Sequence, residues 1–268
     1  MSDFLQTMAV SSSQRAASAG RFSSADFDKP LIPLALDSFD VIAEIKDRSP
    51  AEGDLANEHS DRRVQAQQYV AGGAAAISVL TEPSRFSGSL GHLAEVVAAV
   101  PGTPVMRKDF LVDPVQILEA RKAGASGVLL IVTMLDDRVL RSMLDCAAEH
   151  ELFVLLESFG ADDLSRVRQL LDNPADQQRA EAGQLLFGVN TRDLRTLHVE
   201  PDRLAALAPM LPAGRCVAES GLHNADDAAA VAELGYRLAL VGTALMRSHD
   251  PASLVAAMRA AGAARVAA

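Results

Sequence analysis

Short apolar runs alternate with longer segments of helical period throughout residues 41–261, and this alternation restricts the possible folds more than any other feature. The runs with strand character are 41–47, 75–80, 104–108, 127–132, 153–157, 185–190, 215–219 and 238–241. The segments with helical period are 60–71, 89–100, 114–123, 136–149, 161–171, 201–208, 224–234 and 251–261. Nearly apolar strands separated by helices are typical of a parallel sheet that is buried on both faces. Eight such units in 268 residues predict an α/β protein, a closed (β/α)8 TIM barrel rather than an open sheet.

The sequence predicts one catalytic domain with a short extension before it. No boundary is visible beyond residue 40, so we expect residues 40–268 to form the barrel and residues 1–39 to form an N-terminal extension. Within the extension, residues 3–8 fit a short amphipathic helical turn, and residues 9–25 are expected to be loop or loosely helical. Residues 172–184 are polar and predict an exposed insertion after the fifth helix.

Composition excludes several classes of function. A formal net charge of −10 argues against a protein that binds nucleic acid or a membrane surface, although it leaves room for a small anion held by a few local cations. No run approaches the ~20 apolar residues of a membrane span, and residues 1–21 lack a secretory signal, which predicts a cytoplasmic protein. Cys146 and Cys216 lie in apolar stretches and are expected to be reduced core residues. The six histidines lack metal-ligand spacing, so no metal site is predicted.

Polar residues gather at the carboxyl ends of the predicted strands, where barrels of this kind carry their active sites. Glu44 and Lys46 lie two residues apart, so they share one face of a strand and present an acid and an amine together. The other strand ends contribute Lys108, Glu157, Asn190, Arg192 and Glu219. Strands commonly end in polar residues as they leave the core, but this explains poorly why two lysines and three glutamates follow otherwise apolar runs. We therefore predict that these side chains form one site.

Two glycine-containing turns after the last two strands predict a phosphate site. They are Glu219-Ser220-Gly221 and Val241-Gly242-Thr243, and residues 244–247 can form a short additional helix. Loops in these positions commonly hold a phosphate in this architecture, because glycine lets backbone N–H groups approach the anion. Ser49, after the first strand, can supply a further hydroxyl. Ordinary strand-to-helix turns are the alternative interpretation.

Seven strings of sequence, in order across residues 41–250, match the motifs of one known family. They are V-I-A-E-I-K-D-R-S-P at 41–50, S-V-L-T-E at 78–82 with F-x-G-S-L at 86–90, R-K-D-F-L-V-D-P-x-Q-I at 107–117, V-L-L-I-V at 128–132, G-V-N-T-R-D-L at 188–194, A-E-S-G-L at 218–222 and L-V-G-T-A-L-M-R at 240–247. Together they resemble indole-3-glycerol phosphate synthase of tryptophan biosynthesis. The family's fold is a (β/α)8 barrel with an N-terminal extension that helps to cover the active site, which agrees with the count of strands and helices.

The resemblance implies a lyase that converts 1-(2-carboxyphenylamino)-1-deoxyribulose 5-phosphate to indole-3-glycerol phosphate, carbon dioxide and water without a metal or organic cofactor. Lys108 matches the family's general-acid lysine, which protonates a carbonyl oxygen as the ring closes. Lys46 matches the lysine that contacts the substrate carboxylate and can protonate the leaving hydroxyl. Glu157 matches a catalytic glutamate near the anilino nitrogen and the hydroxyls. The same resemblance implies that Glu44 and Glu219 complete the charged ring and that Asn190 and Arg192 orient it.

The resemblance also implies how the substrate is held. The phosphate-site positions are Ser49, Gly221, Gly242 and Thr243, with Ser220 beside them, and the apolar slot for the anthranilate ring is Phe86, Phe110, Leu129 and Leu194. A flat aromatic ligand needs such a slot, although core packing is the alternative role for each phenylalanine. The implied partner is a phosphorylated small molecule. Family members are often monomers, and some associate with neighbouring enzymes of the tryptophan pathway, so we expect a monomer or a weak association.

The chain departs from the family's pattern in two loops. The family usually has Ser-Pro-Ser-x-Gly after the first strand, and here the order is Ser49-Pro50-Ala51-Glu52-Gly53, so a hydroxyl is lost and an acid lies nearby. Ser158 and Phe159 replace the common Val-His after the fifth strand. None of these changes removes a proposed catalytic residue.

Two alternative functions stay open at this point. One is a phosphosugar isomerase, but such enzymes commonly use an Asp–Asp or Cys–Asp pair at the ends of strands one and six, where this chain has Glu44, Lys46 and Asn190. The other is a non-catalytic barrel that binds a phosphorylated ligand or a partner enzyme. Such a protein would be expected to lose the pocket lysines, because isolated charges in a pocket lower stability.

Overall fold

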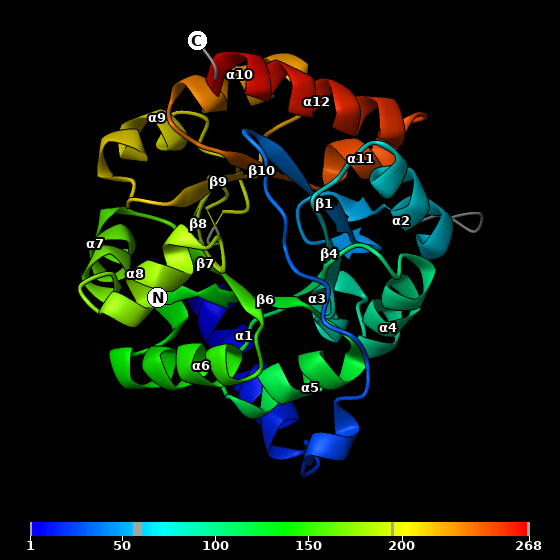
Figure 1. The fold of residues 1–268 in the computed structure, drawn as a ribbon, viewed down its shortest axis with the longest axis vertical. Helices are drawn as coiled ribbons and strands as arrows, with labels where there is room; N and C mark the ends of the chain where they lie inside the picture. Colours follow the sequence, from blue (N-terminus) through cyan, green and yellow to red (C-terminus); the bar gives the residue numbers. More distant parts are fainter. Residues whose placement is uncertain (1, 56–60, 194–195, 267–268) are drawn as a thin grey trace.

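The computed structural model describes residues 2–55, 61–193 and 196–266, and the strands of this part form a closed parallel barrel (Figure 1). The barrel strands are β1 (Asp40–Ile45), β4 (Ala76–Leu80), β5 (Val105–Lys108), β6 (Gly127–Ile131), β7 (Phe153–Ser158), β8 (Leu185–Asn190), β9 (Arg215–Glu219) and β10 (Leu238–Val241). Each strand pairs in parallel with the next along the chain, and β10 pairs with β1. The predicted (β/α)8 fold is confirmed, and every strand lies within two residues of its expected bounds.

Helices surround the strands, except that α1 (Asp3–Ala17) lies behind β6 within the ring (Figure 1). They are α1 (Asp3–Ala17), α2 (Arg62–Ala71), α3 (Pro83–Phe86), α4 (Leu90–Ala99), α5 (Val115–Ala123), α6 (Asp137–Glu149), α7 (Ala161–Leu170), α8 (Pro174–Glu181), α9 (Arg203–Leu207), α10 (Ala225–Glu233), α11 (Thr243–Arg247) and α12 (Pro251–Val266), with 3-10 turns η1 (Ser24–Asp26), η2 (Val132–Met134) and η3 (Ala208–Met210). In the loop after β1, β2 (Arg48–Ser49) and β3 (Gly53–Asp54) pair antiparallel. Among the described residues, no helix is long and apolar enough to cross a membrane.

The two-residue period of the strands decides which side chains enter the barrel. Ile42 belongs to the apolar cluster inside the barrel, whereas Val41 and Ala43 belong to the cluster between the strands and the helices. The interior cluster also includes Met106, Leu129, Phe153, Leu155, Leu186, Val217, Leu238 and Leu240. By the same alternation Glu44 follows Ile42 on the inner face, at the carboxyl end of β1. The apolar interior therefore forms the floor beneath the polar strand ends.

Helix α1 is much longer than the turn predicted for residues 3–8, because residues 9–17 continue the helix. The Ser2 side chain caps its start, and Leu5, Met8 and Ser12 are buried along one face. Leu5 and Met8 pack with the interior cluster of the barrel. Residues 9–17, predicted to be loop or loosely helical, are regular α-helix, because tertiary packing rather than local propensity stabilises this Ser- and Ala-rich segment.

The polar segment 172–184 is an insertion between α7 and β8 and is mostly exposed, as predicted, and residues 174–181 of it form α8. Asn173 caps the helix, and Pro174 occupies its first turn. Asp176 is buried and accepts hydrogen bonds from Arg141 of α6. The segment is therefore an exposed helical insertion that one buried carboxylate fixes to α6.

Candidate active site

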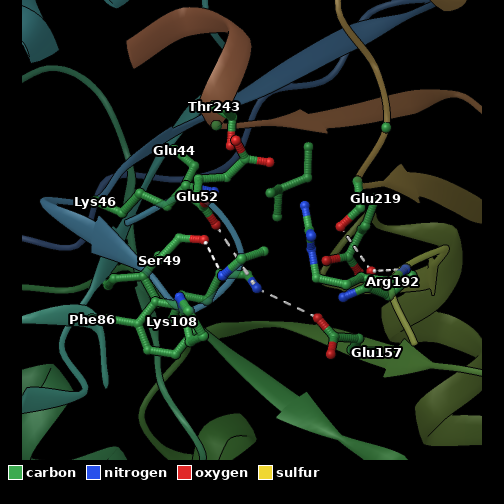
Figure 2. A pocket seen from close by; sticks show the side chains of 18 of the residues that line it. Glu44, Lys46, Ser49, Glu52, Phe86, Lys108, Glu157, Arg192, Glu219 and Thr243 are labelled. Atoms are coloured by element: carbon green, nitrogen blue, oxygen red, sulfur yellow. Dashed lines mark hydrogen bonds and ion pairs between the residues drawn. The ribbon is translucent and has the colours of Figure 1, made fainter. Parts of the chain in front are cut away.

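A cavity opens at the carboxyl ends of the barrel strands, and every predicted site residue within the described part of the chain lines it. These residues are Glu44, Lys46, Ser49, Phe86, Lys108, Phe110, Leu129, Glu157, Asn190, Arg192, Glu219, Ser220, Gly221, Gly242 and Thr243. Leu194, also predicted, lies outside the described residues. Figure 2 shows Lys108 reaching toward Glu157 across the cavity, with Glu44 and Lys46 on one side and Arg192 and Glu219 on the other.

The lysines and glutamates form a chain of contacts across the cavity. Lys46 Nζ lies 2.6 Å from Glu44 Oε1, and Lys108 Nζ lies 3.8 Å from Glu44 Oε2. Lys108 Nζ also donates to Glu157 Oε2 at 3.5 Å. The strand end that carries Glu44 and Lys46 is far along the polypeptide from Lys108 and from Glu157, but all four bring their charges to one mouth of the barrel. The sequence-based expectation that these side chains meet agrees with this geometry.

The charges of Glu44 and Lys108 support one another. Burial by itself would raise the pKa of Glu44, but the ammonium groups of Lys46 and Lys108 outweigh it, so the pKa lies below its usual value. Burial would likewise lower the pKa of Lys108, but the carboxylates of Glu157, Glu44 and Glu219 outweigh it and hold this pKa above its usual value. Lys108 is therefore a charged ammonium group at neutral pH, with a proton to donate.

Glu219 differs from the other carboxylates, because both of its side-chain oxygens are buried and no N–H or hydroxyl group in the described part of the chain donates to them, while the carboxyl group of Glu157 lies beside them. Burial raises its pKa well above the usual value, and the neighbouring charge of Glu157 raises it further. Gly188 on β8 leaves the space that this side chain occupies, since a Cβ atom there would overlap Glu219 Oε1. A carboxyl group buried without an N–H or hydroxyl donor lowers the free energy of unfolding.

Replacing Glu219 by glutamine should therefore stabilise the fold while it lowers activity. Because the folded-state pKa is raised, wild-type stability falls as the pH rises from about 4.5 toward the folded-state pKa. We expect Glu219→Gln to raise the free energy of unfolding by about 1–3 kcal/mol at neutral pH, with the gain shrinking as the pH falls toward 4.5. Urea unfolding of both proteins from pH 4 to 8 measures this difference. A gain that does not change with pH would contradict the assignment to ionisation.

Hydrogen bonds fix the carboxyl end of β8. The side-chain oxygen of Asn190 accepts from Ser220 Oγ at 2.8 Å and from the backbone N–H of Arg192 at 2.9 Å. Its backbone oxygen accepts from Arg203 at 2.9 Å. The guanidinium of Arg192 donates to the backbone oxygen of Leu197 at 2.7 Å. Asn190 thus links the ends of the neighbouring strands β8 and β9 at the cavity mouth.

Glycine-containing turns and hydroxyl side chains line the proposed phosphate end of the cavity. Ser220 and Gly221 adopt left-handed conformations, with φ of 68° and 74°, so the chain turns sharply after β9. Gly242 begins the turn into α11, and a Cβ atom there would overlap Glu44 Oε1. Ser49 and Thr243 line the same cavity. Glycine at 242 is therefore required by the side chain of Glu44 as much as by any anion.

Aromatic rings form one wall of the cavity. Phe110 lies 6.0 Å from Phe86 and 5.8 Å from Phe4, measured between ring centroids, and Phe4 meets it edge-on. Leu129 lines the cavity beside them. Phe4 of α1 therefore joins the residues that were predicted to form an apolar slot.

Comparisons with known proteins show the family of this chain. A family model described as Indole-3-glycerol phosphate synthase matches residues 9–258. The chain belongs to the indole-3-glycerol phosphate synthase family. An indole-3-glycerol phosphate synthase from a Nocardioides species is 45% identical over 87% of this chain and 86% of its own length. Another from Mycobacterium leprae is 46% identical over 83% of this chain and 77% of its own length.

A solved structure supports the fold independently. The 3-hexulose-6-phosphate synthase of Salmonella typhimurium superposes with a TM-score of 0.64 over 85% of this chain and 100% of its own. The sequence identity is 18%, so this likeness concerns the barrel alone.

Sequence reasoning missed several residues that line the cavity of this synthase-family chain. They are Phe4, Pro50, Ala51, Glu52, Leu80, Asp109, Ile131, Leu197, Val199, Leu222, His223, Leu240 and Val241. Glu52 pairs with Arg247 of α11, with 3.0 Å between Oε2 and the guanidinium nitrogen. Phe4 had a weak signal in the amphipathic pattern of residues 3–8, but nothing in the sequence indicated where that segment packs. Within the described residues, no group of three or more His, Cys, Asp and Glu side chains is placed to hold a metal ion.

Proposed function

We propose that this chain converts 1-(2-carboxyphenylamino)-1-deoxyribulose 5-phosphate to indole-3-glycerol phosphate, carbon dioxide and water in tryptophan biosynthesis. Relatives that are 45% and 46% identical over most of the chain bear the name of this enzyme. The observation that carries the proposal is the charged group at one mouth of the barrel, in which Lys108 contacts both Glu44 and Glu157. These groups suit a reaction that moves several protons without redox change.

Ring closure is assigned to Lys108. The aromatic carbon attacks the ketone, a carbon–carbon bond forms, and the carbonyl oxygen takes up a proton as its double bond opens. Lys108 donates this proton and, as an ammonium group, stabilises the oxyanion that develops. Its raised pKa keeps it protonated until substrate arrives. The carboxylate on the ring carbon that made the attack then leaves as carbon dioxide, and the electron pair of the broken bond restores the aromatic ring.

Dehydration is assigned to Lys46 and Glu157. Lys46 protonates the hydroxyl that leaves as water, and Glu157, near the anilino nitrogen, accepts the proton lost from the adjacent carbon bonded to that nitrogen, so that the indole double bond forms and the N–H is kept. Glu44 lies 2.6 Å from the Lys46 ammonium and holds it beside the hydroxyl. The residues that line the two ends of the cavity bind the rest of the substrate: Ser49, Ser220, Gly221, Gly242 and Thr243 take the phosphate, and Phe86, Phe110 and Leu129 take the ring.

The same proposal includes a cytoplasmic setting and action as a monomer or in weak association with other enzymes of the pathway. Cys216 is buried, Cys146 is half-buried, and both thiols are free, as is usual in a reducing compartment. The substrate is a phosphorylated small molecule, so no macromolecular partner is needed for turnover.

Indole fluorescence tests the proposed activity directly, because the chain contains no tryptophan. Incubating the purified protein with the substrate should produce rising indole emission, with release of one carbon dioxide per product. Binding of the substrate without any emission would instead favour the non-catalytic barrel. A reference sample without protein controls for spontaneous cyclisation.

A further inference from the structure

We infer that Arg15 of α1 is a positioning residue for the proposed general acid, acting through Asp109, so that the N-terminal helix is a working part of the active site. The inference rests on the proposed function. It goes beyond covering the cavity, because it assigns to one extension side chain an effect on the chemical step.

The contact between Arg15 and Asp109 is bidentate and joins segments 94 residues apart. Arg15 Nη1 donates to Asp109 Oδ2 and Nη2 donates to Oδ1, both at 2.7 Å. The Asp109 side chain is fully buried, and that of Arg15 is 26% exposed. Short paired bonds of this kind are stronger and more directional than a surface ion pair.

Asp109 directly follows Lys108, the last residue of β5. Its carboxylate also accepts from Thr81 Oγ1 at 2.7 Å, from Arg107 at 3.2 Å and from the backbone N–H of Phe110 at 2.8 Å. These bonds set the direction of the chain as it leaves the strand. Because Lys108 and Phe110 flank this carboxylate, its orientation decides both where the ammonium points and where the aromatic ring stands.

Arg15 is the one contribution from outside the barrel among the side-chain partners that the structure describes for the Asp109 carboxylate. The other two side chains come from Thr81, which follows β4, and Arg107 of β5. Burial alone would raise the pKa of Asp109, but Arg15 and Arg107 outweigh it, so the carboxylate is ionised and demands strong donors. Without Arg15, the two oxygens of the Asp109 carboxylate would lose two of their donors, and residues 108–110 would be held less firmly.

A groove beside the ion pair makes the idea testable by chemical rescue. It is lined by Ser11, Gln14 and Ser18 of the N-terminal segment, by Arg15 itself and by Thr81 and Arg107 on the barrel side. A small planar cation can therefore reach the place of the Arg15 side chain when that side chain is removed.

The experiment compares Arg15→Ala, Arg15→Lys and Arg21→Ala in the full-length chain. Arg21 is an exposed arginine of the same extension and serves as the matched control. We expect Arg15→Ala to lower kcat roughly tenfold, because a misplacement of Lys108 by a fraction of an ångström is enough. KM should change less than kcat. Dilute guanidinium chloride, far below denaturing concentrations, should restore part of the lost kcat for Arg15→Ala and have no such effect on Arg21→Ala.

Arg15→Lys keeps the charge but loses the paired geometry, so its kcat should lie between those of the wild type and Arg15→Ala. The inference is overturned if folded Arg15→Ala, or Arg15→Lys should the alanine variant not fold, keeps wild-type kcat. It is equally overturned if kcat falls but guanidinium restores none of it, since the loss would then reflect a disturbed helix. Failure of the wild-type chain itself to form indole would refute the proposed function instead.

Discussion

Replacing Lys108 by alanine should remove most ring closure while leaving substrate affinity measurable. The variant loses the proton donor and the charge that stabilises the oxyanion, so we expect turnover to fall by about 10²–10⁴-fold. Binding should persist, because the phosphate end and the aromatic slot are formed by other residues. Indole emission in single-turnover experiments measures the rate of the chemical step, and calorimetric titration measures the affinity for the substrate.

Lys108→Arg separates the two roles of this side chain. Arginine keeps a positive charge near Glu44 and Glu157 but gives up its proton far less readily than lysine. If proton donation limits the step, the arginine variant should be nearly as slow as the alanine variant, although its fold should be more stable. Near-normal turnover in Lys108→Ala would refute the general-acid assignment.

Much of the site was predictable because strand ends in a parallel barrel converge. Glu44 and Lys46 follow the inward position of Ile42 by the two-residue period. They lie at the carboxyl end of a barrel strand, which is where this fold carries its active site. No comparable rule relates α1 to the barrel. Phe4 and Arg15 reach the site through tertiary packing, and their sequence neighbourhood of Ser and Ala carries no strong period. The sequence therefore predicts only a short helical turn followed by loop or loose helix, and the contributions of Phe4 and Arg15 to the site were missed.

Glycines show a second limit of sequence reasoning. The sequence predicts that Gly242 lets the backbone approach a phosphate, and the structure shows that its hydrogen also leaves room for the Glu44 carboxylate. Gly188 likewise leaves room for the Glu219 carboxylate, and no sequence motif indicates this role. These requirements come from a neighbouring strand, so they become visible only when the register between strands is known.

Replacing Glu157 by glutamine is the second change expected to have a large effect. The amide keeps the shape of the side chain but cannot accept a proton as a carboxylate does, so turnover should fall by about 10²-fold or more without unfolding of the barrel. Glu157 is also the leading charge that holds the pKa of Lys108 above its usual value. In the variant this pKa should therefore fall, and Lys108 should lose its proton at lower pH than in the wild type.

The alkaline limb of the pH–rate profile measures this coupling, because activity that requires a protonated Lys108 is lost as the pH rises through its pKa. The limb should move to lower pH in Glu157→Gln. Asp162→Asn, a substitution at an exposed carboxylate of α7, provides a matched control that should leave both the rate and the limb in place. Full activity of Glu157→Gln would make this carboxylate a bystander. Reduced activity with an unmoved alkaline limb would mean that Glu157 acts on the substrate without setting the protonation of Lys108.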